Sequence, residues 1–137
     1  MKHLFRLGTT LHAKIVKATG KLGGGTEDGS VLVLEHTGAK SGKSRETPLM
    51  FLNGDGGYLV CGSMAGAPKH PAWYHNLKAN PDAVITVDRR EVPVRARELE
   101  GKERSTAWER FTRQNDRWEQ YQSKTERTLP LLLLEPR

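Results

Sequence analysis

Three cations occur in a short segment that follows an apolar stretch of the chain. They are Lys40, Lys43 and Arg45. An arginine can bind a phosphate or carboxylate through two parallel hydrogen bonds, and a lysine adds a point charge. A P-loop is excluded, because only three residues separate Gly38 from Gly42 and Pro48 would interrupt a following helix. The segment is therefore predicted to form a flexible anion-binding hairpin, with a merely solvated basic turn as the alternative.

A second candidate site is the small-residue loop at 62–68, which reads GSMAGAP. The loop leads into a helix that is predicted to start near Pro71, and backbone N–H groups near a helix start can hold an anionic or flat ligand. The alternative is that Gly62 and Gly66 only permit a tight turn. Combined with the basic hairpin, the loop is predicted to be a ligand cradle.

Other site chemistries are not supported by the residue pattern. His70 and His75 are five residues apart rather than the four of a zinc-binding helix, and no acid or cysteine completes a ligand set. There is no Gly-x-Ser-x-Gly turn, and Cys61 lies in an apolar run typical of a strand core. A protein of this kind can still catalyse a reaction when a cofactor carries the difficult step.

The length of 137 residues predicts one domain, and a net charge of +6 is concentrated near the amino terminus. Residues 1–26 contain five lysines and arginines and no acid, which leaves +1 for the remainder. This distribution argues against a nucleic-acid binder, whose basic face would extend over the folded body. Apolar residues recur every three or four positions, so residues 1–25 are predicted to form a basic amphipathic helix.

That helix could lie on an anionic membrane surface, or its apolar face could pack on the domain. No apolar run approaches the roughly 20 residues that a membrane span requires, and no signal peptide is evident. A single cysteine fits a reducing compartment. We therefore expect a cytoplasmic protein, with peripheral membrane contact as a further possibility.

Six strands and two helices are predicted after the first helix. The strands span 31–36, 47–52, 58–62, 83–87, 91–97 and 129–134. One helix starts at Pro71 and ends before Pro81, and another spans 101–124 with Trp108, Phe111, Asn115, Trp118 and Tyr121 on one stripe facing the body. Antiparallel strands with interspersed helices predict an α+β fold built on a small, partly open barrel.

Two long motifs carry a resemblance to a known family. Residues 36–49 read HTGAKSGKSRETPL and residues 62–77 read GSMAGAPKHPAWYHNL. Their order and separation resemble the actinobacterial deazaflavin (F420)-dependent nitroreductases, also described as F420H2-dependent quinone reductases. The resemblance extends over nearly the whole chain. It implies an FMN-binding-type split β-barrel at 26–137, F420 as coenzyme, and hydride transfer to a quinone, an enone or a nitroaromatic.

The resemblance also implies roles for individual residues. Lys40 and Arg45 would hold the phosphate and acidic tail of the coenzyme, and Lys43, Thr47 and Pro48 belong to the same coenzyme site. The deazaflavin ring would be lined by Ser63, Met64, Ala65, Gly66 and Ala67, with a pocket wall of Pro71, Trp73 and Asn76. Trp118 and Tyr121 would face the substrate. Tyr121 is the candidate proton donor, and Ser63 is the second candidate.

Departures from the family pattern bear on the substrate. Ala39 and Met64 stand where basic residues are frequent, and Asn115 and Trp118 stand where tyrosines occur in nitroimidazole-reducing members. A quinone or enone is therefore favoured as acceptor. Two alternatives remain open at this point: FMN, whose phosphate an Arg/Lys pair also suits, and a non-catalytic peripheral membrane domain.

Overall fold

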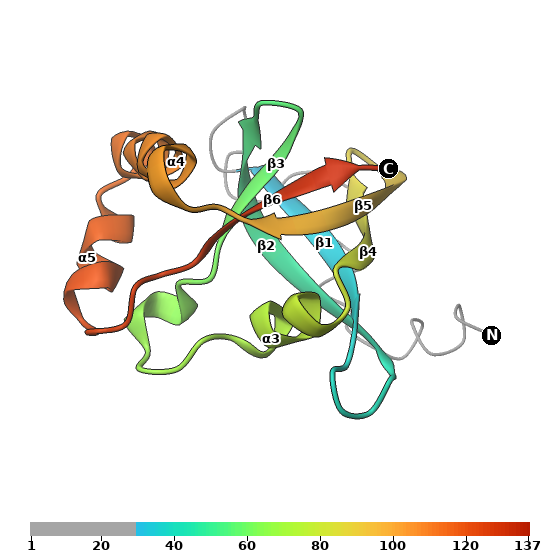
Figure 1. Ribbon diagram of the computed structural model, residues 1–137. Coiled ribbons are helices and arrows are strands. Elements are labelled where there is room, and N and C mark those ends of the chain that lie inside the picture. Colours follow the sequence, from blue (N-terminus) through green and yellow to red (C-terminus); the bar gives the residue numbers. More distant parts are fainter. Residues whose placement is uncertain (1–29) are drawn as a thin grey trace.

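Six antiparallel strands form the centre of the computed structural model, which describes residues 30–137 (Figure 1). They are β1 (Ser30–Thr37), β2 (Ser44–Gly54), β3 (Gly57–Cys61), β4 (Asp82–Val87), β5 (Arg90–Glu98) and β6 (Leu131–Pro136). The predicted helix at 1–25 and the boundary at 26 lie outside the described residues. The α+β split-barrel prediction is confirmed for the part of the chain described.

The ladder order is β1-β2-β3-β6-β5-β4, and pairing of β4 with β1 closes the barrel. The sequence predicted a partly open barrel, whereas the observed barrel is closed. The pairing that closes it, of Val33 with Thr86 and of Glu35 with Val84, joins distant segments and is not visible in local sequence patterns. Strands β1, β2 and β3 follow one another in sequence and pair antiparallel as a meander. The last strand inserts between β3 and β5, so residues far apart in sequence complete the sheet.

Continuous apolar runs in β1 and β6 follow from burial on both faces. Leu132 and Leu134 contribute to the cluster inside the barrel, whereas Leu131 and Leu133 pack in a second cluster with Phe111 of the helical segment. Successive side chains of a strand point to opposite faces, so a strand buried on both sides requires apolar residues at every position. This explains the uninterrupted leucines of β6.

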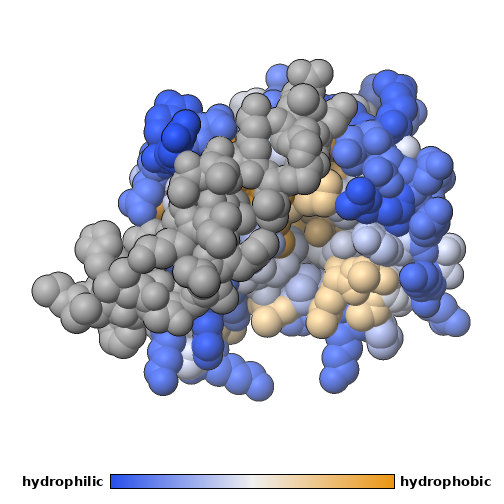
Figure 2. Space-filling view, turned by 180° about the vertical axis from the view of Figure 1, so that it is seen from behind, coloured by the Kyte–Doolittle hydropathy of each residue, from blue (hydrophilic) through white to orange (hydrophobic). Residues whose placement is uncertain are grey.

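Helical segments cover one end and one side of the barrel (Figure 1). They are η1 (Met64–Gly66), α3 (Ala72–Ala79), α4 (Gly101–Gln114) and α5 (Arg117–Ser123). From α3, Trp73 and Leu77 insert into the barrel cluster. Pro71 precedes α3 as its N-cap rather than lying in its first turn, which differs from the prediction by one residue. From behind, hydrophilic side chains dominate the described surface, with only small apolar patches (Figure 2).

The prediction of a single helix at 101–124 is wrong, because the helix is interrupted at Asn115. This residue is extended, with φ −161° and ψ 140°, and its Oδ1 accepts the backbone N–H of Arg117 at 2.8 Å. An asparagine side chain can offer the backbone such an alternative to the helical hydrogen bond. Phe111 and Trp118 still face the body, with ring centroids 5.0 Å apart across the break.

Candidate functional site

Two hollows lie side by side where β2, the 62–68 loop, α3 and α5 meet. The inner hollow, about 360 Å³, is lined by Thr47, Pro48, Leu49, Met50, Cys61, Ser63, Met64, Ala65, Pro71, Ala72, Trp73, Arg117, Trp118 and Tyr121. The hairpin hollow, about 1130 Å³, is lined by His36, Gly38, Ala39, Lys40, Ser41, Ser44, Arg45, Glu46, Thr47, Ala72, Trp73, His75 and Asn76. Both include Thr47, Ala72 and Trp73, so the two hollows adjoin at these residues, and together they are called the groove.

The basic hairpin between β1 and β2 is a closed turn with its cations on the outside. The Gly38 N–H donates to the Lys43 carbonyl at 2.8 Å, and Gly42 adopts φ +71°. Lys40 and Arg45 are exposed and line the hairpin hollow, and within residues 30–137 neither forms an ion pair. Lys43 is also exposed but does not line the hollow. Unneutralised cations at this end favour an anionic ligand.

A buried histidine joins the hairpin to α3. Asn76 Nδ2 lies 3.0 Å from His36 Nδ1, and Asn76 Oδ1 accepts the Ala39 N–H at 2.8 Å. His36 Nε2 lies 3.0 Å from Thr47 Oγ1. Burial, with a smaller contribution from the Arg45 charge, lowers the pKa of His36 to about 4. The imidazole is therefore neutral at pH 7, with Nδ1 as acceptor and Nε2–H as donor.

Asn76 lines the hairpin hollow and also has a structural role in this network. Its amide is already engaged by His36 and by the hairpin backbone, so Asn76 fixes the position of Ala39 relative to α3. His36 was not among the predicted site residues. Its sequence signals were its place at the end of an apolar strand, directly before the basic hairpin, and at the start of the 36–49 motif.

The 62–67 loop adopts a backbone that side chains rarely accept. Met64, Ala65 and Gly66 have φ values of 45°, 54° and 82°. A run of left-handed residues of this kind occurs where the surrounding structure imposes it, and it is often found at functional sites. The side chains of Met64 and Ala65 are exposed at the mouth of the inner hollow.

Two backbone N–H groups that were predicted to face a ligand are used within the loop instead. Gly66 N–H donates to the Ser63 carbonyl at 2.8 Å, and Ala67 N–H donates to the Met64 carbonyl at 3.0 Å. For these two groups the cradle prediction is wrong, because a short 3₁₀ turn consumes their N–H groups. Neither Gly66 nor Ala67 lines the inner hollow.

Arg127 holds this loop from beneath and was missed by the sequence analysis. Its guanidinium donates to the carbonyls of Ala67 at 2.8 Å, Gly62 at 3.1 Å and Ser63 at 2.7 Å. The same group lies 2.9 Å from His70 Nδ1. The segment before β6 carried no local motif, so only the fold places Arg127 under the loop.

Aromatic side chains of α5 also line the inner hollow. Trp118 is buried and donates its indole N–H to Gln114 Oε1 at 2.9 Å, and Tyr121 is half-buried. Their rings are 6.0 Å apart and nearly perpendicular.

Burial raises the pKa of Cys61 to about 12, although two arginines oppose this shift, so the thiol stays protonated at neutral pH.

The groove brings together most of the predicted residues. Lys40, Arg45, Thr47, Pro48, Ser63, Met64, Ala65, Pro71, Trp73, Asn76, Trp118 and Tyr121 line one hollow or both. Of the predicted residues, Lys43, Gly66 and Ala67 do not line either hollow. Arg117 lines the inner hollow without having been predicted.

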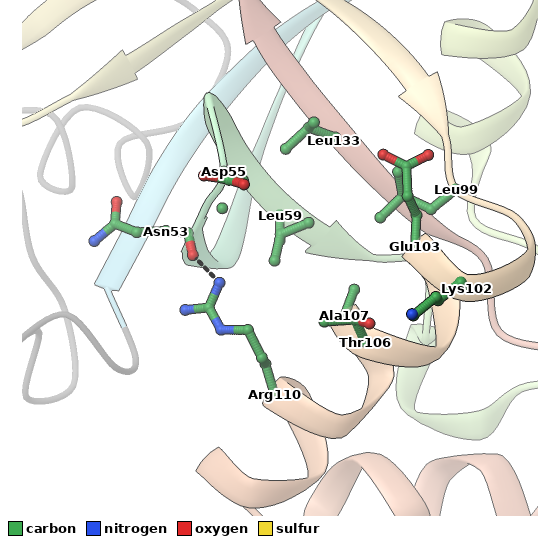
Figure 3. Close-up of a pocket in the computed structure, with 11 residues that line it drawn as sticks. Asn53, Asp55, Leu59, Leu99, Lys102, Glu103, Thr106, Ala107, Arg110 and Leu133 are labelled. Atoms are coloured by element: carbon green, nitrogen blue, oxygen red, sulfur yellow. Dashed lines mark hydrogen bonds between the residues drawn. The ribbon is translucent and has the colours of Figure 1, made fainter.

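A separate hollow of about 620 Å³ lies between the β2–β3 turn and α4 (Figure 3). Leu59, Leu99 and Leu133 form its apolar part. Arg110 at its rim donates to the Asn53 carbonyl, and Glu103 is paired with Arg97 at 2.8 Å. None of the predicted site residues lines this hollow. The groove therefore remains the candidate site.

Fold and groove together define a split β-barrel protein whose two adjoining hollows are lined by exposed cations of the hairpin and by aromatic side chains of α5. The family model described as F420H(2)-dependent quinone reductase matches residues 9–136, and the chain belongs to this family. It is accordingly an F420H2-dependent oxidoreductase.

Individual relatives agree with this assignment. A Mycobacterium tuberculosis protein named F420H(2)-dependent quinone reductase Rv1261c is 38% identical over 106 residues, covering 75% of this chain and 71% of that protein. A solved structure described as F420-H2 dependent reductase FDR-A is 40% identical with a TM-score of 0.70, covering 77% of this chain and 93% of the other. A domain-swapped dimer has the same identity and TM-score and covers 77% and 79%.

Proposed function

We propose that the groove holds reduced F420 and that the chain transfers hydride from it to a quinone. The adjacency of the two hollows, which share Thr47, Ala72 and Trp73, is the observation that supports this most directly. Cations in one hollow and small and aromatic side chains in the adjoining one match a coenzyme with an acidic tail and a flat head.

At the hairpin end, Lys40 and Arg45 bind the phosphate and acidic tail in this proposal. Both line the hollow and have no ion-pair partner within the described part of the chain, so their charge is available. A hydrogen bond to a charged group contributes about 1.5–3 kcal/mol. The first turn of α3, which begins at Ala72 beside both hollows, adds the positive end of a helix dipole.

At the inner end, small side chains leave room for a flat ring. Ser63 and Ala65 line the inner hollow together with Trp118 and Tyr121. When bound, reduced F420 supplies a hydride, that is, one proton with two electrons. The contribution of the protein is to orient donor and acceptor at about 3–3.5 Å and to exclude bulk water.

Reduction of a quinone or enone also requires a proton, for which we propose Tyr121, with Ser63 as second candidate. Both line the inner hollow, and neither hydroxyl has a hydrogen-bond partner among residues 30–137. A Tyr121→Phe change should lower kcat about 10- to 100-fold, since general acid catalysis contributes at least that much. A Ser63→Ala change provides the comparison.

A quinone is favoured over a bulky nitroimidazole because Asn115 and Trp118 replace the tyrosines expected in nitroimidazole-reducing relatives. Trp118 is buried with its indole N–H bound to Gln114, so it offers a ring edge and no free donor to a nitro group. Asn115 makes the break between α4 and α5 with its side chain.

The decisive experiment is a fluorescence titration with F420, followed by turnover of menadione, cyclohexenone and a nitroimidazole with F420H2. We expect saturable binding at micromolar F420 and fastest turnover with menadione. Absence of F420 binding at tens of micromolar would overturn the proposal, as would purification of a yellow protein that retains FMN and turns over only with it.

Membrane contact through residues 1–25 belongs to the same proposal, because quinones reside in membranes. These residues are not described by the structure, and no helix within residues 30–137 is long and apolar enough to cross a bilayer. Co-sedimentation with anionic liposomes should weaken in the Lys14→Ala and Lys17→Ala double variant. Binding that is unchanged by this double variant, or absent from the wild type, would contradict membrane contact through this segment.

A further inference from the structure

Arg117 is the first residue of α5 and lies in the wall of the inner hollow. Its side chain is half-buried, and its Nη1 lies 3.4 Å from the sulfur of Met50. A thioether is a weak hydrogen-bond acceptor, whereas a guanidinium carries five N–H donors. Most of the hydrogen-bonding capacity of Arg117 is therefore left for other groups.

The neighbourhood of Arg117 does not neutralise its charge. Asp116 and Glu119 are close in sequence but exposed, and within the described residues Arg117 forms no ion pair. A cation in the first turn of a helix is also opposed by the helix dipole, which favours acids there. Helix stability does not explain an arginine at this position, and such local conflicts are expected at functional sites.

Arg117 contacts β2 at Met50, away from the strand residue that both hollows share. Thr47 belongs to both hollows, and Met50, which Arg117 contacts, lies three residues further along β2. A strand rises about 3.3 Å per residue, so these two positions are about 10 Å apart. Arg117 is thus removed from the coenzyme tail and stands beside Trp118 and Tyr121 on α5.

We propose that Arg117 binds the carbonyl oxygen of the acceptor and stabilises the negative charge that develops there. This inference rests on the proposed function. The hydride forms a new bond to an electron-poor carbon of a conjugated carbonyl compound, and the displaced π electrons move through the conjugated system to the carbonyl oxygen. The guanidinium donates to that oxygen, which then takes a proton from Tyr121 or from water. F420H2 is oxidised by two electrons and the acceptor is reduced by two.

This arrangement specifies the substrate class as acceptors whose reduction places charge on oxygen, namely quinones and enones. A fixed donor aimed at a developing oxyanion acts mainly in the transition state, and removal of one such donor costs about 10²–10³ in kcat. An acceptor that takes hydride without forming an oxyanion gains nothing from Arg117. Methylene blue, a cationic dye without a carbonyl group, is such an acceptor.

The test compares Arg117→Gln and Arg117→Lys with wild type, using menadione and methylene blue as acceptors and F420 titration as a check on folding. We expect Arg117→Gln to lower kcat with menadione about 100-fold while F420 affinity and methylene blue reduction stay within about twofold. Arg117→Lys should recover part of the loss. The matched control is Arg113→Gln, which changes an exposed arginine of α4 that pairs with Glu109.

The outcomes separate this inference from the proposed function. Wild-type protein that fails to bind F420 would overturn both. Normal F420 binding with an unchanged ratio of menadione to methylene blue turnover in Arg117→Gln would overturn the role of Arg117 alone. An equal loss of turnover with both acceptors would show that Arg117 maintains the structure of α5. That outcome would also contradict the inference.

Discussion

Arg127 Nη2 donates to the Ser63 carbonyl at 2.7 Å, while Nε of the same guanidinium donates to the Ala67 carbonyl at 2.8 Å. One side chain therefore holds both ends of the loop that lines the inner hollow. Burial lowers the pKa of Arg127, yet a guanidinium remains protonated in proteins. The strained φ values of Met64 and Ala65 persist because Arg127 fixes the carbonyls on either side of them.

Replacement of Arg127 should therefore loosen the loop. We expect Arg127→Ala to lower the free energy of unfolding by about 2 kcal/mol or more, since carbonyls lose a charged donor. F420 affinity should fall about tenfold or more. Urea unfolding and F420 titration measure the two effects.

Arg127→Lys should be intermediate in both measurements, because one ammonium cannot reach three carbonyls in a planar arrangement. Arg90→Ala, an exposed cation at the far end of the barrel, serves as control. Unchanged F420 affinity in Arg127→Ala would show that the loop keeps its shape without this support.

The contact between the loop and α5 can be tested at Gly66. A Cβ there would lie 2.6 Å from the Tyr121 carbonyl oxygen, and φ is +82°. We expect Gly66→Ala to cost about 2–4 kcal/mol in unfolding free energy, combining left-handed strain with overpacking. Displacement of Tyr121 should also reduce quinone turnover.

Gly56→Ala is the matched control, because Gly56 has φ +78° but open space around its Cβ position. The Gly56→Ala change should lower the free energy of unfolding by about 1–2 kcal/mol, from backbone strain alone. Equal destabilisation by the two changes, measured in urea, would show that α5 moves away from the loop without cost.

Stability should depend on pH through His36. Its pKa is lowered from 6.5 to about 4 in the folded protein, mainly by burial. Between these values the unfolded chain binds a proton that the folded chain does not, so the free energy of unfolding falls as pH drops from about 6.5 to about 4. Urea midpoints measured across this range should show the slope.

His36→Gln should flatten that slope while lowering stability at pH 7, because the links to Thr47 and Asn76 are altered. His75→Gln, a change at an exposed histidine of α3, is the comparison variant. A His36→Gln profile parallel to wild type would mean that other groups cause the pH dependence.

Lys40 and Arg45 of the hairpin should both contribute to coenzyme binding. We expect Lys40→Ala and Arg45→Ala each to weaken F420 binding about tenfold, as for a lost charge-assisted hydrogen bond, and the effect should shrink at high salt. Lys43→Ala should have a smaller effect, because Lys43 does not line the hollow. If Lys43→Ala had the largest effect, the tail would lie on the outer side of the hairpin. Isothermal titration at two salt concentrations distinguishes these cases.

Local patterns in the sequence determined the strands, the basic hairpin and the small-residue loop. Period-two alternation in β5, apolar runs in β1 and β6, and the glycine-bounded turns all have physical causes within a few residues. The two long motifs were sufficient to predict the family and its coenzyme. The family resemblance also identified half of the residues that line the groove, including Arg45, Ser63 and Trp118.

Only the tertiary structure decided which distant residues support that site. Arg127 reaches a loop some 60 positions earlier, and Asn76 joins His36 across 40 positions, because barrel closure and the insertion of β6 bring these segments together. Such contacts leave no periodic signal, since each depends on strand order rather than on neighbouring residues. The same holds for Arg117, which reaches the inner hollow only because Asn115 ends α4 and starts a new helix.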